Sequence, residues 1–213
     1  TDRFLKSRLL NNQYWSFVDI SHQSTNYFKK NIKLSSKIKK TNFKIVDVIN
    51  NLEKINFNDY NLVTGSAFLD ILPKSWFKNF HKLNVDTEIV YFALNYNGNF
   101  KFFPKHKDDK KILNIFNKDQ KSDKGIGEVA VGPDCTDLIN KVFKRTHKTY
   151  VLDSTWDVSK NYEFQIYFLN FCREIIQKNK LNFDDWLKFR LRSIKEKNSR
   201  FILNNTDFLA IKK

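Results

Sequence analysis

The sequence predicts an α/β layer fold, and three observations carry this prediction. Short apolar blocks alternate along the chain with segments of helical periodicity. Two early blocks, FVDI and LVTGSA, are short and apolar, as is typical of parallel strands that are buried on both faces. Hydrophobic residues make up 41% of the 213 residues, with 21 Phe, so the chain has enough apolar surface for a substantial core. We therefore expect one globular domain.

The expected strands are short runs rich in apolar, β-branched and aromatic residues. They span residues 14–20, 43–48, 61–66, 88–95, 99–103, 149–153 and 200–211. Asn97 and Gly98 separate the fourth and fifth of these runs, and an Asn-Gly pair between alternating apolar residues predicts a tight hairpin. The last run is either one strand or a hairpin.

The expected helices carry apolar residues at helical spacing. They span residues 1–10, 24–31, 67–83, 108–118, 133–146, 161–179 and 184–197, with a short turn or helix at 49–54 and a loop at 119–132. Pro73 is expected to break the third helix, whereas Pro133 suits the first turn of the fifth.

The formal net charge of +15 admits two interpretations. A basic surface is typical of proteins that bind nucleic acid or an acidic membrane. Alternatively, the abundance of Lys, Asn, Ile and Phe reflects an AT-rich genome, and the Lys residues are spread along the chain, most densely at 29–40 and 105–124. No apolar run approaches the roughly 20 residues of a membrane span, and no signal-peptide pattern begins the chain.

The cysteines and histidines show no metal-ligand spacing. Cys135 and Cys172 lie far apart in the sequence, and the four His form no pair at helical spacing. We therefore expect no metal site and two reduced thiols in a cytoplasmic protein. The sequence also contains no Met, and it begins in a segment of helical character. This start predicts that upstream residues are missing, unless Met was removed by engineering.

Several motifs, taken in order, carry a resemblance to a known family. The chain resembles the second to fifth strands of class I S-adenosylmethionine-dependent methyltransferases in the segments FVDIS, FKIVDV, NLVTGSAFLDIL and EIVYFALNY. A bacterial subgroup of that superfamily is similar further on, in the segments FNKDQKSDKGIGEVAVGPDCTDLINKVF, DSTW, DDWLKFR and FILNNTDFLAIKK. The resemblance covers nearly the whole chain, and the order and spacing of the motifs are more specific than any one motif.

The resemblance implies a Rossmann-like three-layer sandwich with strand order 3-2-1-4-5-7-6 and an antiparallel seventh strand. Residues 1–213 would form a single domain of this type without its first strand and glycine-rich loop, because the alignment places Thr1 just past that loop. The segments 104–132 and 157–199 would be helical and loop embellishments that form a substrate lid. Since the first strand is central, its absence would leave the second and fourth strands without their main neighbour. The chain alone is then expected to be unstable, unless these two strands close up or another segment fills the gap.

The resemblance further implies S-adenosylmethionine as the cofactor. Asp19, which is followed by Ile20, would accept hydrogen bonds from the ribose hydroxyls, although a helix cap or a surface carboxylate is the alternative. Asp47 and Val48 would contact the adenine, although Asp also suits a helix N-cap.

The end of the expected fourth strand would approach the cofactor closely. The backbone of Ser66 and Ala67 would lie beside the sulfur and the ribose, and the neighbouring Gly65 would keep this approach close.

Five residues are candidates for the substrate site. Asp70 would point into it or would cap the interrupted helix. Gln120, Asp123 and Lys124 lie in a polar loop that forms a lid or remains solvated, and Trp156 would form a wall or belong to the core. Direct methyl transfer mainly requires alignment and exclusion of water, so the catalytic base stays unknown, with Asp70 and Asp123 as candidates.

The first functional hypothesis is therefore methyl transfer to a small or medium-sized polar metabolite. The second is a non-catalytic or truncated protein of the same fold, which absence of cofactor binding would favour. The third is RNA binding or RNA methylation, which a steep salt dependence would support and the absence of an Asn-Pro-Pro-aromatic motif weakens. Two departures from the subgroup bear on substrate and activity: Asp119 stands where His is frequent, and Ile126 where Phe is frequent. The oligomeric state is unknown.

Overall fold

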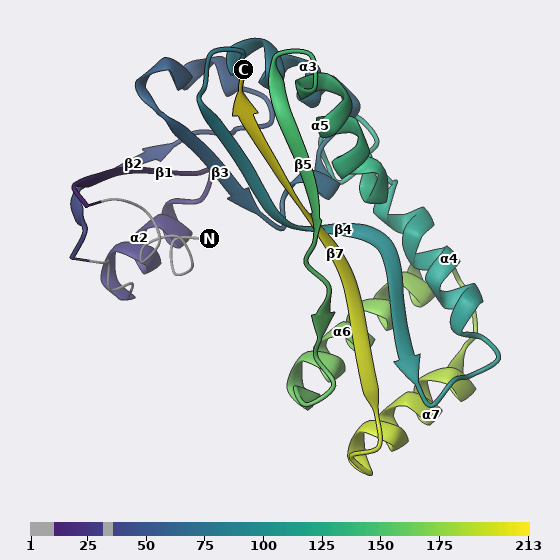
Figure 1. The fold of residues 1–213 in the computed structure, drawn as a ribbon. Coiled ribbons are helices and arrows are strands. Elements are labelled where there is room, and N and C mark those ends of the chain that lie inside the picture. The colour runs from purple at the N-terminus through teal and green to yellow at the C-terminus, as the bar shows by residue number, and fades with distance from the viewer. Residues whose placement is uncertain (1–10, 32–35) are drawn as a thin grey trace.

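The computed structural model describes residues 11–31 and 36–213, and it confirms the α/β class (Figure 1). The expected helix at 1–10 lies outside these residues. The strands are β1 (Gln13–Asp19), β2 (Ile38–Ile45), β3 (Leu62–Ser66), β4 (Ile89–Phe103), β5 (His147–Asp153), β6 (Trp156–Asp157) and β7 (Arg200–Lys212). The α-helices are α2 (His22–Asn31), α3 (Lys74–Leu83), α4 (Asp109–Gln120), α5 (Cys135–Phe143), α6 (Tyr162–Lys178) and α7 (Asp184–Lys195).

The described strands form two sheets. β1 and β2 pair in parallel, with Phe17 opposite Phe43. The larger sheet has the order β3-β4-β7-β5, in which β3 and β4 are parallel, β7 is antiparallel to both of its neighbours, and β6 adds to β7. These neighbours agree with the two halves of the expected order. Among the described strands, β1 and β3 do not pair with each other, so the two halves remain separate sheets.

β4 is one long strand, so the predicted hairpin at Asn97-Gly98 is wrong. Gly98 has φ = +89°, and the pairing with β7 shifts register between Tyr96 and Phe100 before it continues to Phe103. The Asn-Gly pair therefore forms a bulge, which uses the same positive φ that a hairpin turn would need. β7 is likewise one long strand and no hairpin.

Some boundaries also differ from the prediction. β2 begins and ends earlier than the expected strand at 43–48, and the expected helix 67–83 is a helical turn at Leu69–Ile71 followed by α3. Pro73 lies at the N-cap of α3, because a proline inside the helix would lack the backbone N–H that the helix needs.

The first hydrophobic core lies between the upper part of the larger sheet and the helices α3 and α5. Trp76, Phe77 and Phe80 of α3 are buried there against Val90 and Phe92 of β4. Val18 of β1 packs against this core, and just past β2 the Val48 carbonyl accepts a hydrogen bond from the Trp76 Nε1–H at 2.8 Å. The opposite face of the sheet shows exposed apolar side chains, such as Leu152 at 51% and Ile211 at 40%.

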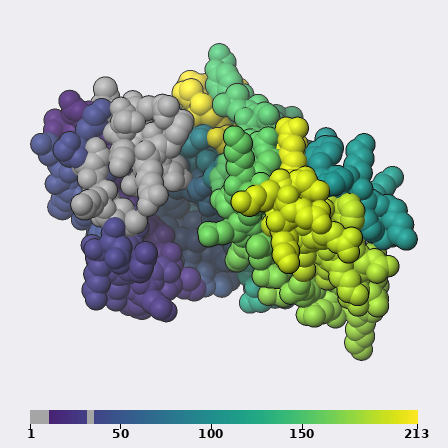
Figure 2. Space-filling model, turned by 90° about the horizontal axis from the view of Figure 1, so that it is seen from below, coloured from purple at the N-terminus to yellow at the C-terminus, as the bar shows by residue number. Residues whose placement is uncertain are grey.

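A second core lies at the other end of β4 and β7. The aromatic side chains Phe100, Phe116, Phe168 and Phe201 pack there among α4, α6 and α7 (Figure 1). The fully buried Arg190 of α7 donates to the Pro104 carbonyl at 2.6 Å and forms an ion pair with Asp109 of α4. The segments 104–132 and 157–199 therefore contribute to a core of their own, and Figure 2 shows α2 and α7 toward opposite ends of the molecule.

Candidate functional site

Asp19 ends β1 and sits beside the start of α2. Its Oδ1 accepts a hydrogen bond from the Ser21 backbone N–H at 2.7 Å, and its own carbonyl accepts from the Val46 N–H at 3.0 Å. The first bond makes Asp19 a local cap, which was the alternative interpretation of this residue. The side chain is exposed, and its Oδ2 has no hydrogen-bond partner among the described residues. Ile20 follows at 63% exposed.

Asp47, just past β2, is committed to a turn. Its Oδ1 accepts from the backbone N–H groups of Ile49 at 2.9 Å and Asn50 at 3.2 Å, and its Oδ2 accepts from the Asn50 side chain at 2.8 Å. These bonds, led by that from the Asn50 side chain, lower the pKa of the Asp47 carboxyl. The carboxylate therefore stays ionised, with both oxygens already used locally. The Val48 carbonyl is likewise engaged, by Trp76.

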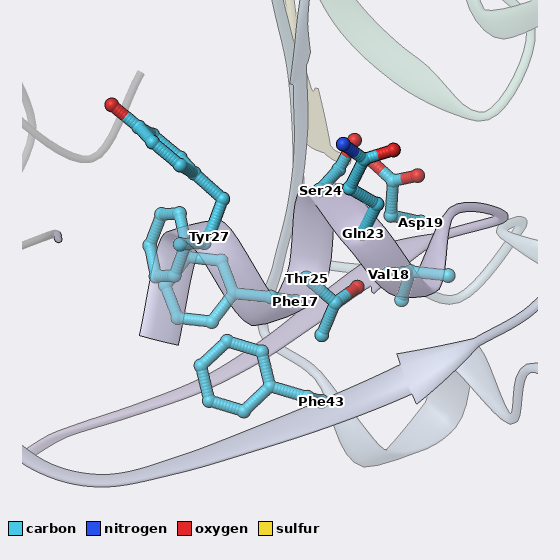
Figure 3. A pocket seen from close by; sticks show the side chains of 9 residues that line it. Phe17, Val18, Asp19, Gln23, Ser24, Thr25, Tyr27 and Phe43 are labelled. Atoms are coloured by element: carbon cyan, nitrogen blue, oxygen red, sulfur yellow. The ribbon is translucent and has the colours of Figure 1, made fainter. Parts of the chain in front are cut away.

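A cavity of about 580 Å³ opens beside Asp19, between β1, β2 and α2 (Figure 3). Aromatic side chains gather at one end, where the rings of Phe17 and Phe43 lie 5.3 Å apart between centroids. Asp19, Gln23 and Ser24 gather at the other end. Such a cavity suits a ligand with a flat apolar part and a hydroxylated part.

The backbone just past β3 and at a bulge inside β4 is strained. Ala67 has φ = +50° and Leu94 has φ = +57°, a region that residues with a Cβ seldom adopt. The Ala67 N–H donates to the Ala93 carbonyl at 3.0 Å, so the residue that follows β3 is joined here to the bulged part of β4. Strain of this kind persists where the surrounding structure enforces it, and it occurs often at functional sites.

The close approach that Gly65 allows has a packing partner within the protein. A Cβ at this position would lie 2.8 Å from Cε1 of Phe92 on the neighbouring strand. Glycine is therefore required by the Phe92 ring.

Asp70 lies in the helical turn that follows β3. Burial raises the pKa of its carboxyl, while its own backbone N–H and the charge of Lys124 act in the opposite direction. Burial, and after it the charge of Asp70, raises the pKa of the Cys135 thiol to about 12. Burial also raises the pKa of the Tyr96 phenol, with a smaller contribution from the charge of Asp70. Among the predicted substrate residues, Lys124 therefore acts on Asp70 through its charge, while its hydrogen bonds go to Asp119 and Ser122.

The polar loop after α4 is ordered by its own contacts. The Asp123 carboxylate accepts from the N–H groups of Gly125, Ile126 and Gly127 at 2.8–3.1 Å through Oδ1, and these bonds, that of Ile126 first, lower its pKa. A carboxylate stabilised in this way is a poor proton acceptor. Lys124 donates to the Asp119 carbonyl at 2.7 Å and pairs with its carboxylate at 3.1 Å.

The two remaining candidates are Gln120, which is buried, and Trp156, which is partly exposed. Gln120, at the end of α4, is only 6% exposed. Trp156 lies in β6, is 38% exposed, and packs 6.2 Å from Phe164 between ring centroids.

Tyr96 was not among the sequence candidates. Its hydroxyl donates to Asn117 Oδ1 at 2.8 Å, and Asn117 Nδ2 donates to the Gly98 carbonyl at 2.7 Å. Asn117 lies in the motif that carries the resemblance, and its two hydrogen bonds join α4 to β4 at Tyr96 and at Gly98.

S-adenosylmethionine carries an adenine ring, two ribose hydroxyls and a methionine tail. The aromatic end of the cavity suits its adenine, and Asp19 Oδ2, which accepts no hydrogen bond from the residues that the structure describes, suits its ribose hydroxyls. Asp47 fits less well, because its oxygens are used in the turn. Among the described residues, no group of His, Cys, Asp and Glu side chains is placed to hold a metal ion. None of the described helices combines the length and apolar character of a membrane span.

Neither a protein-family model nor a curated protein matches the chain. Among solved structures, it is similar to phosphoethanolamine N-methyltransferase 2 of Haemonchus contortus in complex with phosphomonomethylethanolamine and S-adenosylhomocysteine, at 9% identity and a TM-score of 0.39 over 98% of this chain. This chain spans 51% of that protein's length.

A putative methyltransferase of Bacillus halodurans is similar at 10% identity and a TM-score of 0.40, over 97% of this chain and 94% of that one. The mycolic acid cyclopropane synthase CmaA1 is similar at 6% identity and a TM-score of 0.40, over 98% of this chain and 86% of that one. With TM-scores below 0.5, these likenesses assign no function to the chain.

Proposed function

We propose that the protein transfers a methyl group from S-adenosylmethionine to a small or medium-sized polar metabolite. The observation that carries the proposal is the strand arrangement: parallel β1–β2 and β3–β4 units, with an antiparallel β7 inserted between β4 and β5. These are the neighbours that the motif resemblance implies. In such sheets, ligands bind at the carboxyl ends of the parallel strands, where Asp19, Ala67 and Asp70 lie.

The bound cofactor would supply an activated methyl group. Asp19 would hold its ribose through Oδ2, because Oδ1 already accepts from the Ser21 N–H, and the aromatic end of the cavity would receive its adenine. The strained backbone at Ser66 and Ala67 would border the reacting centre. The protein's contribution would then be to align the acceptor and to exclude water, beside Asp70 and Tyr96.

Titration calorimetry with S-adenosylhomocysteine tests the proposal. The chain is expected to bind it, and Asp19→Asn is expected to weaken binding by about tenfold, because a charge-assisted hydrogen bond is lost. Asn retains an acceptor for the Ser21 N–H, so the local turn should persist. Asp185→Asn, which changes an exposed carboxylate on α7, serves as the matched control and should bind as the wild type does. A folded wild-type chain with no affinity would instead favour a non-catalytic protein of this fold.

A further inference from the structure

The strand β5 forms one edge of the larger sheet (Figure 1). Among the described strands it pairs only with β7, along its whole length. In an antiparallel pair, every second residue directs its backbone N–H and C=O away from the partner strand. Between Lys148 and Asp153, the backbone groups make no hydrogen bond to any described residue outside β7. The outer side of β5 is therefore a row of donors and acceptors to which another strand can pair.

β5 lacks the features by which proteins usually protect such an edge, which are a very short strand, a proline, a bulge or several charges. It is seven residues long and contains no proline, and its pairing with β7 has no shift of register. Tyr150, Val151 and Leu152 follow one another and are all exposed, the last two at 44% and 51%. Since successive side chains of a strand point to opposite faces, both faces of this edge are apolar and uncovered.

The strand at the opposite edge of the larger sheet differs from β5. β3 has only five residues, all of them partly buried, and Val63 packs against the first core. None of its side chains is as exposed as Val151 or Leu152. Of these two edges, the one at β5 is thus the one that is open to a partner.

The sequence of β5 is complementary to a second copy of itself. Lys148 lies near the beginning of the strand and Asp153 at its end. In an antiparallel pair centred on Val151, Tyr150 of each copy lies opposite Leu152 of the other, and Val151 lies opposite Val151. The Lys148 end of one copy then lies beside the Asp153 end of the other, so opposite charges meet. A parallel arrangement would instead bring like charges together, which is unfavourable.

We propose that two copies of this chain associate through β5, which pairs antiparallel with β5 of the second copy about a two-fold axis at Val151. The pairing joins the two larger sheets into one and leaves the partly buried β3 as the outer strand at each end. It covers the apolar side chains of the open edge and satisfies its backbone groups. This association goes beyond the proposed function and does not depend on a cofactor.

Sedimentation velocity of the full chain over a range of protein concentrations tests the proposal. A salt concentration of about 0.3 M, at which the Debye length is roughly 6 Å, screens the repulsion between two copies of net charge +15. The wild type is expected to dimerise as its concentration rises. Val151→Lys is expected to weaken this association by about tenfold or more, because two ammonium groups then lie opposite each other. Tyr167→Lys, at a 71% exposed position on α6, adds the same charge elsewhere and should associate as the wild type does.

A mixture of two variants tests the two-fold arrangement. Val151→Asp alone is also expected to be monomeric, because two carboxylates then lie opposite each other. An equal mixture of Val151→Lys and Val151→Asp should associate again, because each pair joins opposite charges. Circular dichroism establishes that the variants are folded. In the wild type, hydrogen exchange provides a measurement without any variant: the β5 amides should be better protected at high than at low protein concentration, and the β3 amides equally protected at both.

Several results would overturn the proposal. These are a wild type that stays monomeric at its highest soluble concentration, equal weakening by Val151→Lys and Tyr167→Lys, or a mixture of the two folded Val151 variants that fails to associate. A dimer whose β5 amides exchange as fast as those of the monomer would place the interface elsewhere.

Discussion

Asp70 and His81 are two residues at which ionisation opposes folding. Asp70 is shielded without a donor from another described residue. His81 and His147 are linked through Thr146, whose hydroxyl lies 3.0 Å from His81 Nε2 and 2.8 Å from His147 Nδ1. His147 is 1% exposed and its Nε2 lies 2.9 Å from the Thr87 carbonyl, so this nitrogen carries the hydrogen. Both sites therefore predict a dependence of stability on pH.

Asp70→Asn is expected to raise the melting temperature at neutral pH. The folded-state pKa of Asp70 lies above its unfolded value, so its charge destabilises the fold at pH values above both. The gain should disappear below the unfolded pKa, where the carboxyl is protonated in both states. Thermal unfolding at several pH values measures this, with Asp137→Asn as the control. A lower melting temperature for Asp70→Asn at neutral pH would contradict the account.

His81 predicts a pH dependence of the opposite sign, in which the fold loses stability in mild acid. Burial, and then the neighbouring His147, lower the pKa of His81 below its ordinary value of 6.5. The unfolded chain therefore takes up protons first, and stability should fall as the pH drops below that value. Denaturant unfolding between neutral pH and pH 5 measures the effect, and His81→Gln should reduce it. If the free energy of unfolding of His81→Gln fell with pH as steeply as that of the wild type, groups other than His81 would cause the loss.

At the scale of elements, the strand pair β3–β4 contains one especially close contact between a backbone and a side chain. Gly65 lies opposite Phe92, and an added Cβ would lie 2.8 Å from its ring. The bulges of β4 are similarly specific, because the Asp207 carboxylate accepts from the Leu94 N–H at 2.8 Å and the Tyr91 hydroxyl at 2.6 Å. These contacts position the end of β3 and the bulged part of β4, which border the candidate site.

Gly65→Ala is therefore expected to cost about 1–3 kcal/mol of unfolding free energy through overpacking. Phe92→Leu made alone is expected to destabilise the fold, because it leaves a cavity where the ring was. In the double variant it should recover part of the stability lost in Gly65→Ala, because the added Cβ then has room. Denaturant unfolding of the two single variants and the double variant gives the coupling. Strictly additive losses would mean that the Phe92 ring is not what excludes a side chain at Gly65.

At the scale of the whole molecule, two hydrophobic cores are joined by β4 and β7, whereas β1 and β2 pair only with each other among the described strands. A two-stranded sheet is marginally stable in isolation. Amide hydrogen exchange should therefore be about tenfold faster in β1 and β2 than in β4 and β7. Mass spectrometry of exchanged peptides measures this. Equal protection would show that the two-stranded sheet is as firmly held as the larger one.

The limits of sequence-based prediction follow from the same architecture. Strand and helix positions were predicted well where apolar runs were strong, as in β3 and α6, because local periodicity determines them. The Asn97-Gly98 pair was misinterpreted because a bulge and a hairpin need the same backbone freedom, and only the pairing with β7 separates them. The hydrogen bond of Tyr96 to Asn117 joins residues 21 apart in the sequence, so local sequence did not reveal it. The roles of Asp19 and Asp70 in binding stay predictions.

A crystal structure of the chain with S-adenosylhomocysteine would test the central claim most directly. The account predicts that the ribose hydroxyls bind the Asp19 carboxylate, that the adenine lies toward Phe17 and Phe43, and that the sulfur lies beside the Ser66–Ala67 backbone. Ligand bound away from Asp19, or none bound at a saturating concentration, would contradict a methyltransferase built on this sheet.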